Sequence, residues 1–280
     1  MKRILGLIAV VTLALLLVAC GGKKEFDFNK GTLVVGMEAD YAPFNWLETK
    51  SNEYNHPLDG RPGNFVAGYD VSMAKLIAEE LELELVIKAM AWEALPNALS
   101  SGMIDVIIAG MSPTEDRKEN ILFSNAYYAV NHVVVAKESG ALTNMTKLEE
   151  LKGHKGIGQA NTVYDELVKL TVERYGAVRL NPLDSTPLIA NAVSTNVAQF
   201  MIVEKPVALG VLLKNPDLKI AFETDENVFD LTEGDRSLSV GMTKINTTLQ
   251  SRINEALATI TQDTRDTLMD QAVKRSADGN

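Results

Sequence analysis

Residues 104–117 read IDVIIAGMSPTEDR, an apolar run that ends at a glycine and is followed by hydroxyl, acidic and arginine side chains. The run Ile104–Ala109 predicts a buried strand of the kind found in parallel sheets. Ligands of open α/β sheets bind beyond the carboxyl ends of such strands, which places Gly110, Ser112 and Arg117 at a candidate site. A guanidinium fits a carboxylate through two parallel hydrogen bonds, and Ser112 with nearby N–H groups completes an anion cradle. Taken alone, the arginine fits an exposed side chain paired with its acidic neighbours equally well.

Outward from this stretch, the first half of the chain alternates predicted strands and helices. The residues Gly68-Tyr69-Asp70 predict the start of one helix, with Asp70 as its N-cap. Another helix is expected over 92–101. The polar stretch 48–63 carries two prolines and two glycines and predicts a loop. Strands are expected at 32–36, 84–89 and 104–109. This order predicts a layered α/β domain with right-handed crossovers.

The second half predicts a second α/β unit. Thr162 and Asp165 have the spacing of a capping box at a helix start. Further strands are expected at 132–136, 155–159, 200–203 and 238–242, and terminal helices at 246–260 and 264–274. We therefore expect one domain from 31–131 and 235–280 and a second from 132–234. Two strands cross between them, and a ligand cleft lies between the domains.

The first residues predict an export signal. Lys2 and Arg3 precede an apolar run too short for a comfortable membrane span. The run ends at Leu17-Val18-Ala19-Cys20, which resembles the signal of bacterial lipoproteins, whose cysteine becomes the lipidated first residue. We expect 1–19 to be a signal peptide, Cys20 the lipidation site and 20–30 a tether, with the body lipid-anchored on the extracytoplasmic face of the cell membrane. The alternative is a retained membrane anchor with an inert cysteine.

Composition excludes several classes of function. The 280 residues include 27 Lys and Arg against 37 Asp and Glu, a formal net charge of −10. Without a basic run in the body, a nucleic-acid partner is not expected. Cys20 is the single cysteine, and the three histidines lack metal-ligand spacing. We therefore expect neither a metal site nor a cofactor, and the chain has no glycine-rich phosphate loop.

Six motifs in order resemble one family. The chain is similar to the family 3 extracellular solute-binding proteins, the polar amino acid receptors of ABC importers, over about 32–274. The resemblance implies a two-domain, type II periplasmic-binding-protein-like fold. The motifs are Glu38-Ala39-Asp40-Tyr41-Ala42-Pro43-Phe44, Gly68-Tyr69-Asp70, Gly110 to Arg117, Phe123 to Tyr128, Gly158 to Thr162, and Val203 to Ala208.

The resemblance implies roles for the groups that hold the backbone part of an amino acid. Arg117 grips the ligand α-carboxylate, assisted by Ser112 and the backbone of Gly110. Thr162 donates a further hydrogen bond to this carboxylate from the second domain. Glu204 accepts from the α-ammonium, at a position where the family usually has the shorter aspartate.

The resemblance also implies side-chain readers. Tyr41 and Tyr69 match the aromatic walls that sandwich the ligand side chain. Glu38 matches an acidic position facing its far end, and Gln159 lies on the cleft side of its strand. Asn161 stands where glycine is common, and asparagine tolerates the left-handed conformation that such a turn needs. By contrast, Trp92 is assigned to packing and Tyr127-Tyr128 to hinge support.

The expected function is capture of a polar amino acid by cleft closure. A monomeric receptor then delivers it to a membrane permease driven by separate ATPase subunits. Two tyrosines and Glu38 suit a cationic side chain, so arginine, lysine or histidine is the first expectation. Cystine and glutamine are the alternative ligands. The alternative classes are a dehydratase-like enzyme, which the two glutamates of the cleft allow, and a surface adhesin.

Overall fold

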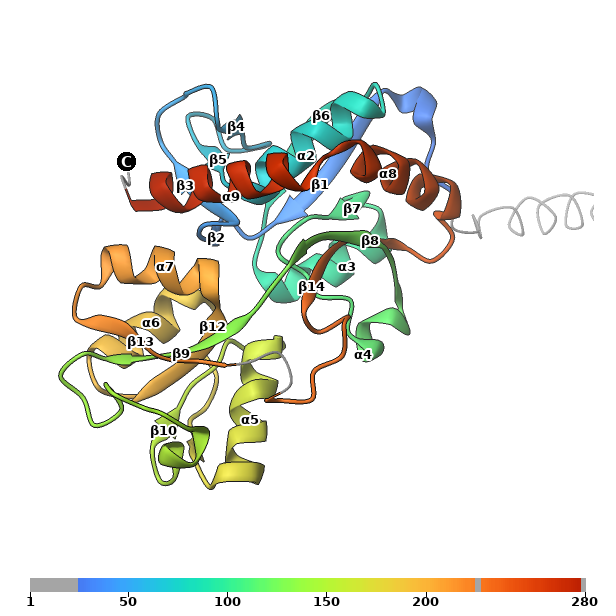
Figure 1. Cartoon of the computed structure of the whole chain (residues 1–280). Helices are drawn as coiled ribbons and strands as arrows, with labels where there is room; N and C mark the ends of the chain where they lie inside the picture. Colours follow the sequence, from blue (N-terminus) through green and yellow to red (C-terminus); the bar gives the residue numbers. More distant parts are fainter. Residues whose placement is uncertain (1–24, 225–227, 278–280) are drawn as a thin grey trace, which may run out of the picture.

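The computed structural model describes residues 25–224 and 228–277, which form two α/β units, one above the other in Figure 1. Each unit is built on a five-stranded sheet, and a four-stranded sheet is attached to the first. The expected signal peptide and Cys20 lie outside the described residues. Within the described residues, none of the helices is long and apolar enough to cross a membrane.

The first unit is built on sheet A, with strand order β6-β1-β7-β14-β8. β6 and β7 run parallel to β1, whereas β14 runs antiparallel to β7 and β8. Its strands are β1 (Thr32–Met37), β6 (Glu84–Ala89), β7 (Val106–Ile107), β8 (Ile121–Ala129) and β14 (Ser237–Thr243). Its helices are α2 (Tyr69–Glu80), α3 (Leu95–Ser101), α4 (Glu115–Lys118), α8 (Thr247–Thr259) and α9 (Gln262–Ala277), with 3-10 turns η1 (Phe28–Lys30) and η2 (Trp92–Ala94). Of the apolar run 104–109, only the centre pairs as a strand.

The second unit is built on sheet C, with strand order β11-β10-β12-β9-β13. All five residues of the central strand β12 are buried. Its first four residues form the apolar run that predicts a buried strand, and the fifth is Glu204. The strands are β9 (His132–Lys137), β10 (Lys155–Gly156), β11 (Val178–Arg179), β12 (Phe200–Glu204) and β13 (Leu218–Glu223). The helices are α5 (Val163–Tyr175), α6 (Thr186–Ser194) and α7 (Lys205–Lys214), with the 3-10 turn η3 (Leu148–Leu151).

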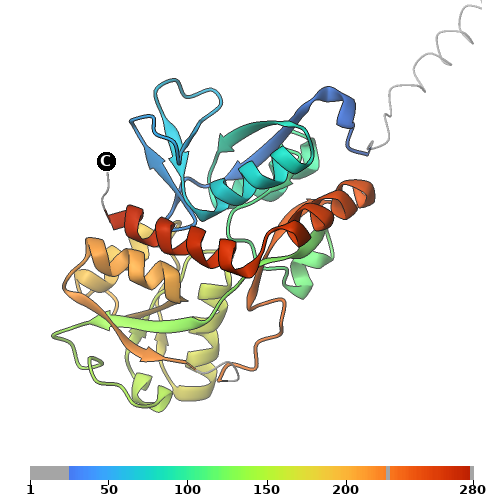
Figure 2. The ribbon, with the colours of Figure 1, turned by 45° about the horizontal axis from the view of Figure 1, so that its top comes forward.

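The chain passes between the units twice. One passage joins β8 to β9 and the other leads from β13 to β14, and these strands are neighbours within their own sheets. The passages meet where the Thr224 hydroxyl donates to the His132 carbonyl and where the Val130 N–H donates to the Arg236 carbonyl. Between these points, the described residues 228–235 loop away from the β8–β9 passage, as Figure 2 shows, and Asp230 pairs with Arg174. On the other side, α9 of the first unit packs against α7 of the second. The two-domain α/β architecture with crossing strands is thus confirmed.

The stretch 48–63, expected to be a loop, carries part of a small sheet. Sheet B has the strand order β2-β3-β5-β4 and contains β2 (Asp40–Tyr41), β3 (Asn45–Glu48), β4 (His56–Pro57) and β5 (Phe65–Ala67). β4 has two residues, too few for a visible alternation of polar and apolar side chains. Glu48 joins this region to α9 by pairing with Arg275 at 3.4 Å, and the Arg275 guanidinium lies 3.9 Å from the Tyr54 ring centroid.

Asp70 is not the N-cap of α2, contrary to expectation. Gly68 holds that position, and no side chain caps it. Asp70 is fully buried instead, where its two carboxylate oxygens accept from the Tyr127 hydroxyl and the Asn45 amide, each at 2.8 Å. Burial raises the pKa of Asp70 to about 6, and these two hydrogen bonds oppose the rise. The carboxyl therefore joins α2, β8 and β3 inside the core.

The predicted capping box at α5 is half formed. Thr162 is the N-cap, and its Oγ1 accepts from the Tyr164 N–H at 3.2 Å. Asp165 makes a bidentate pair with Arg179 of β11, at 2.7 and 2.8 Å. Because a guanidinium offers two parallel donors, it competes well against a single backbone N–H for this carboxylate.

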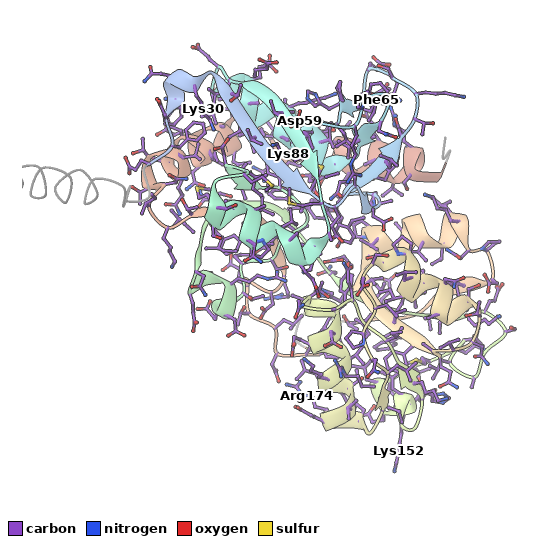
Figure 3. All side chains as sticks on the ribbon, turned by 180° about the vertical axis from the view of Figure 1, so that it is seen from behind. Lys30, Asp59, Phe65, Lys88, Lys152 and Arg174 are labelled. Carbon is purple, nitrogen blue, oxygen red and sulfur yellow. The ribbon has the colours of Figure 1, made fainter. Side chains whose placement is uncertain are left out.

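The N-terminal segment 26–30, expected to belong to a tether, packs on the first unit. The Phe26 N–H donates to Asn246 Oδ1 at 2.9 Å, and the Phe26 and Phe28 rings meet edge to face at 4.9 Å. Lys30 pairs with Asp105 at 2.6 Å. Figure 3 shows Lys30 on the first unit, with Lys152 and Arg174 at the far end of the second.

The buried carboxyl of Asp70 generates a prediction about stability. Asp70→Ala leaves the Tyr127 hydroxyl and the Asn45 amide buried without an acceptor, which costs about 3 kcal/mol of unfolding free energy. Urea denaturation measures this loss. Asp266→Ala, at an exposed position of α9, is the control and changes the midpoint little. An unchanged midpoint for Asp70→Ala contradicts the structural role.

Candidate functional site

A small pocket, partly open to solvent, lies between the two units. Residues from both units line it: Glu38, Tyr41, Trp92, Ala109, Gly110, Ser112, Arg117, Gln159, Thr162, Val163, Tyr164 and Glu204. Eight of the ten expected ligand-binding residues are therefore brought together; Tyr69 and Asn161 are not in the lining.

Arg117 is held by carbonyl oxygens from both units. It lies in the short helix α4, where its N–H is capped by Thr114. Its Nη1 donates to the Ser112 carbonyl at 2.9 Å and its Nη2 to the Asn161 carbonyl at 3.1 Å. Burial lowers the pKa of Arg117 to about 10, so the group stays cationic at neutral pH. Its neighbour Glu115 pairs with Lys118, which disfavours the alternative of a simple local ion pair.

Gly110 is required by its conformation and by a close approach. Its φ is +59°, a region that side chains disfavour, and an added Cβ would collide with the Tyr41 ring. Its N–H donates to the Tyr127 hydroxyl at 3.1 Å, and that hydroxyl donates to Asp70. The backbone of Gly110 beside the cavity is thus held, through the Tyr127 hydroxyl, by the buried Asp70 carboxyl.

Tyr41 bridges the units at Glu204. Its hydroxyl donates to Glu204 Oε2 at 2.7 Å and lies 2.6 Å from the Tyr164 hydroxyl. Burial raises the pKa of Glu204 to about 7, opposed by the hydrogen bond from Tyr41. The Tyr41 ring is stacked on Phe44 with centroids 5.1 Å apart, so the hydroxyl is aimed across the cleft from a rigid ring.

A second carboxyl lies at another part of the lining. Glu38 Oε1 accepts from Gln159 Nε2 at 3.1 Å, again across the two units. Burial raises the pKa of Glu38 to about 7, and the Gln159 hydrogen bond opposes this rise. The cavity therefore combines one guanidinium with two carboxyl groups.

Thr162 and Asn161 form the turn before α5. The Thr162 hydroxyl donates to the Gln159 carbonyl at 2.8 Å, so it is engaged within the turn. Asn161 has φ +58°, in the left-handed region anticipated for it. Its carbonyl accepts from both Arg117 and Trp92, and its side chain donates to Glu93. Asn161 thus bridges the units without lining the cavity.

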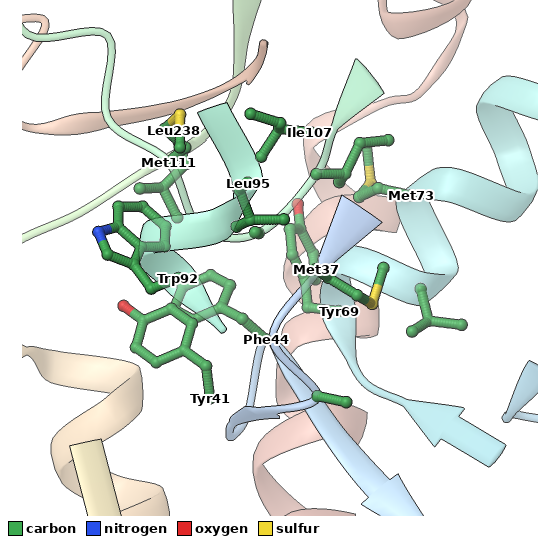
Figure 4. Packing of buried hydrophobic residues seen from close by; sticks show 14 of the residues in the cluster. Met37, Tyr41, Phe44, Tyr69, Met73, Trp92, Leu95, Ile107, Met111 and Leu238 are labelled. Carbon is green, nitrogen blue, oxygen red and sulfur yellow. The ribbon is translucent and has the colours of Figure 1, made fainter. Parts of the chain in front are cut away.

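Tyr69 lies in the core, so its expected place as an aromatic wall is wrong. It is fully buried, and its hydroxyl donates to the Tyr127 carbonyl at 3.0 Å. Figure 4 shows it near Met37, deeper than Tyr41 and Trp92. As the first residue of α2, it sits on the helix face that packs against the sheet.

Trp92, expected to pack, is buried in the hydrophobic core and in addition lines the cavity. Its indole N–H donates to the Asn161 carbonyl at 3.1 Å, and its ring lies 5.0 Å from the Arg117 guanidinium carbon. The available signal was position: Trp92 opens the turn that follows the carboxyl end of β6, the edge at which ligands of such sheets bind. Tyr164, Val163 and Ala109 were also missed. In the described residues, no cluster of His, Cys, Asp and Glu suits a metal ion.

Comparison with protein families gives one match over most of the chain. The family is described as "Bacterial extracellular solute-binding proteins, family 3", and residues 33–274 match. The arginine-binding extracellular protein ArtP of Bacillus subtilis is 29% identical over 221 residues, which cover 78% of this chain and 79% of that protein. The L-cystine-binding protein TcyJ of Escherichia coli is 25% identical over 236 residues, covering 84% and 79%.

Solved structures give the same picture. A substrate-binding protein of an amino acid ABC transporter, AbpA from Streptococcus pneumoniae, was solved bound to L-arginine. It has a TM-score of 0.74 and 25% identity, covering 89% of this chain and 97% of that one. An ancestral arginine-binding protein bound to glutamine has a TM-score of 0.69 and 28% identity, covering 86% and 97%.

The buried carboxyl of Glu204 predicts a pH dependence of stability. Its pKa is raised from 4.5 to about 7 on folding, so the folded state binds the proton more tightly. The contribution of Glu204 to stability therefore falls as pH rises through the window from 4.5 to 7. Thermal melts of the ligand-free protein compare Glu204→Gln with wild type at pH 5 and pH 8. The melting temperature of the variant, relative to that of wild type, is higher at pH 8 than at pH 5.

The exposed Glu173 of α5 supplies the control. Glu173→Gln shows the same difference from wild type at both pH values. If Glu204→Gln behaves like this control, burial does not raise the pKa of Glu204.

Proposed function

The chain belongs to family 3 of the bacterial extracellular solute-binding proteins, and we propose that its cleft binds an amino acid with a cationic side chain, with arginine as the first choice. At the level of the family, it is an amino-acid-binding component of an ABC transporter and not an enzyme. The alternative of a dehydratase-like enzyme is therefore not supported. The specific ligand is the proposal.

The observation that carries the proposal is the charge set of the cavity. One guanidinium, Arg117, lines it together with the carboxyls of Glu38 and Glu204. A cationic amino acid has the complementary set, one carboxylate and two cations. A zwitterion with a neutral side chain leaves one of the two buried carboxyls without a charged partner, which costs free energy.

In the proposed complex, the α-carboxylate binds at Arg117. Ser112 and the Gly110 backbone line the cavity from the same unit, and Thr162 from the other. The guanidinium already spends two donors on the carbonyls of Ser112 and Asn161, which fixes its plane. A carboxylate takes remaining donors in charge-assisted hydrogen bonds, each of which contributes about 1.5–3 kcal/mol.

The α-ammonium binds at Glu204 in this proposal. The carboxylate has four lone-pair sites, so it accepts from an ammonium while it keeps the bond from Tyr41. Binding of a cation favours the ionised form of Glu204 and returns its pKa toward the ordinary range. Ligand capture near pH 7 therefore releases protons.

The side chain of the ligand extends toward Glu38. Tyr41, Trp92 and Tyr164 are the aromatic residues of the cavity lining, and their rings suit a flat cation through cation–π contact. Relatives and neighbours named for arginine support this choice. Cystine and glutamine stay as alternatives, and each appears in the name of a similar protein.

We also propose where the protein works. Cys20 carries the lipid anchor, residues 1–19 are removed, and the body stands at the extracytoplasmic face of the cell membrane as a monomer. Closure of the cleft around the ligand creates the form that docks on the permease, whose ATPase subunits supply the energy. A surface adhesin on the same anchor is the remaining alternative class, and loss of amino acid uptake on gene deletion separates the two.

Binding is tested on the body from Gly21 onward against the twenty amino acids, cystine and ornithine. Arginine at a hundredfold excess over its Kd stabilises the protein by about 2.7 kcal/mol, which thermal shift detects. Arg117→Ala removes at least two charge-assisted bonds and weakens binding by about 100-fold or more in calorimetry.

The matched control is Arg174→Ala. Arg174 pairs with the exposed Asp230 in the second unit and does not line the cavity, so its loss leaves the Kd unchanged. A protein that binds glutamine or cystine but no cationic amino acid contradicts the proposed ligand class. Equal affinities for wild type and Arg117→Ala contradict the assignment of the carboxylate site.

A further inference from the structure

One side chain of the cavity lining has all its hydrogen-bonding groups engaged by protein. Gln159 Nε2 donates to Glu38 Oε1 at 3.1 Å and to the Asp184 carbonyl at 3.2 Å. Gln159 Oε1 accepts from the Thr186 hydroxyl at 3.0 Å. Gln159 is 2% exposed and Thr186 4% exposed. The amide is therefore bonded on both its nitrogen and its oxygen in a buried setting.

These partners fix which end of the amide faces the cavity carboxyl. The Asp184 carbonyl accepts and does not donate, as does an ionised Glu38, whereas the Thr186 hydroxyl has a proton to give. An amide turned by 180° would set its oxygen against these acceptors, whereas the Thr186 hydroxyl, which both donates and accepts, pairs with either end. The Asp184 carbonyl and Glu38 therefore set the orientation of the amide, and Thr186 supplies the donor to its oxygen.

The backbone holds Thr186 in place. The Ala160 N–H donates to the Leu183 carbonyl at 2.9 Å, and the Leu183 N–H donates to the Gly158 carbonyl at 3.1 Å. Residues 183–186 are thereby tied to the turn that carries Gln159, and α6 begins at Thr186. The hydroxyl is presented by the first turn of a helix, not by a free loop.

These bonds determine which hydrogen-bonding groups Gln159 and Glu38 offer to a ligand. Both hydrogens of the Gln159 amide are spent on protein acceptors, so this side chain offers the ligand no free donor. Within the described part of the chain, Glu38 Oε2 makes no hydrogen bond, which leaves an acceptor beside the cavity. A guanidinium or ammonium brings only donors, whereas a carboxamide brings a donor and an acceptor.

We propose that Thr186, which does not line the cavity, is a specificity-positioning residue. By holding the amide oxygen, it keeps both amide hydrogens on Glu38 and the Asp184 carbonyl, so that Gln159 offers the ligand no donor. This arrangement favours a ligand side chain that carries only donors over the carboxamide of glutamine. The inference rests on the proposed function, since it concerns the selectivity of the same cleft.

The test is the ratio of arginine to glutamine affinity, measured by calorimetry on the body from Gly21 onward. Thr186→Val removes the hydroxyl and keeps the shape, so the amide oxygen loses its donor and the amide is held only at its nitrogen. Arginine affinity falls about tenfold, while glutamine affinity holds or rises. The ratio therefore falls at least tenfold, and Thr186→Ser, which keeps the hydroxyl, restores it.

Thr171→Val is the matched control. Thr171 is a fully buried threonine of α5 whose hydroxyl donates to the Val168 carbonyl, away from the cavity lining. Its replacement lowers the melting temperature and leaves the affinity ratio at the wild-type value. If Thr186→Val acts only on the stability of the fold, it also lowers the melting temperature and leaves the affinity ratio unchanged.

Two failures are distinguishable. Wild-type protein that binds arginine, with an unchanged ratio in Thr186→Val, overturns the role of Thr186 and leaves the proposed function standing. Wild-type protein that binds no cationic amino acid overturns the proposed function itself. If Thr186→Val does not fold, Gln159→Met removes the same amide and is expected to lower the same ratio; an unchanged ratio there also overturns the inference.

Discussion

The guanidinium of Arg117 is a charge bonded to backbone carbonyls of two units and to no carboxylate in the described structure. Keeping a cation in such a place requires acceptors at fixed positions, and the chain supplies them from two unusual turns. One is the Gly110–Ser112 turn after β7, and the other is the left-handed Asn161 before α5. The environment of this guanidinium and the contact between the units are thus one arrangement.

A buried hydrogen-bond network around Asp70 supports the residues of the first unit that line the cavity. The Asp70 carboxyl accepts from Tyr127 and Asn45, Tyr127 accepts from the Gly110 N–H, and Asn45 accepts from the Ala39 N–H at 2.7 Å. The two backbone segments that present Glu38 and Gly110 to the cavity are thereby held by one buried carboxyl. A core network of this kind ties the position of the cleft to the packing of the first unit.

Most of the fold was predictable because long apolar runs and glycine-ended strands have strong local signals. The same patterns located the Gly110–Arg117 turn and the Thr162 cap. Local sequence pattern failed where a partner distant in sequence determines the position and contacts of a side chain. Asp70 looks like an N-cap until Tyr127 and Asn45 are placed beside it. Tyr69 was expected at the cleft and lies in the core, because the direction of an aromatic ring depends on the sheet beneath it. The two-residue strand β4 has no readable alternation, and the docking of Phe26 depends on Asn246, 220 residues away.

The docking of Phe26 also decides which unit bears a mechanical load applied to the N-terminal segment. The Phe26 N–H is held by Asn246 and the Lys30 ammonium by Asp105, and both partners belong to the first unit. A pull on this segment therefore acts on the first unit directly. It reaches the second unit only through the contacts and the two passages that join the units.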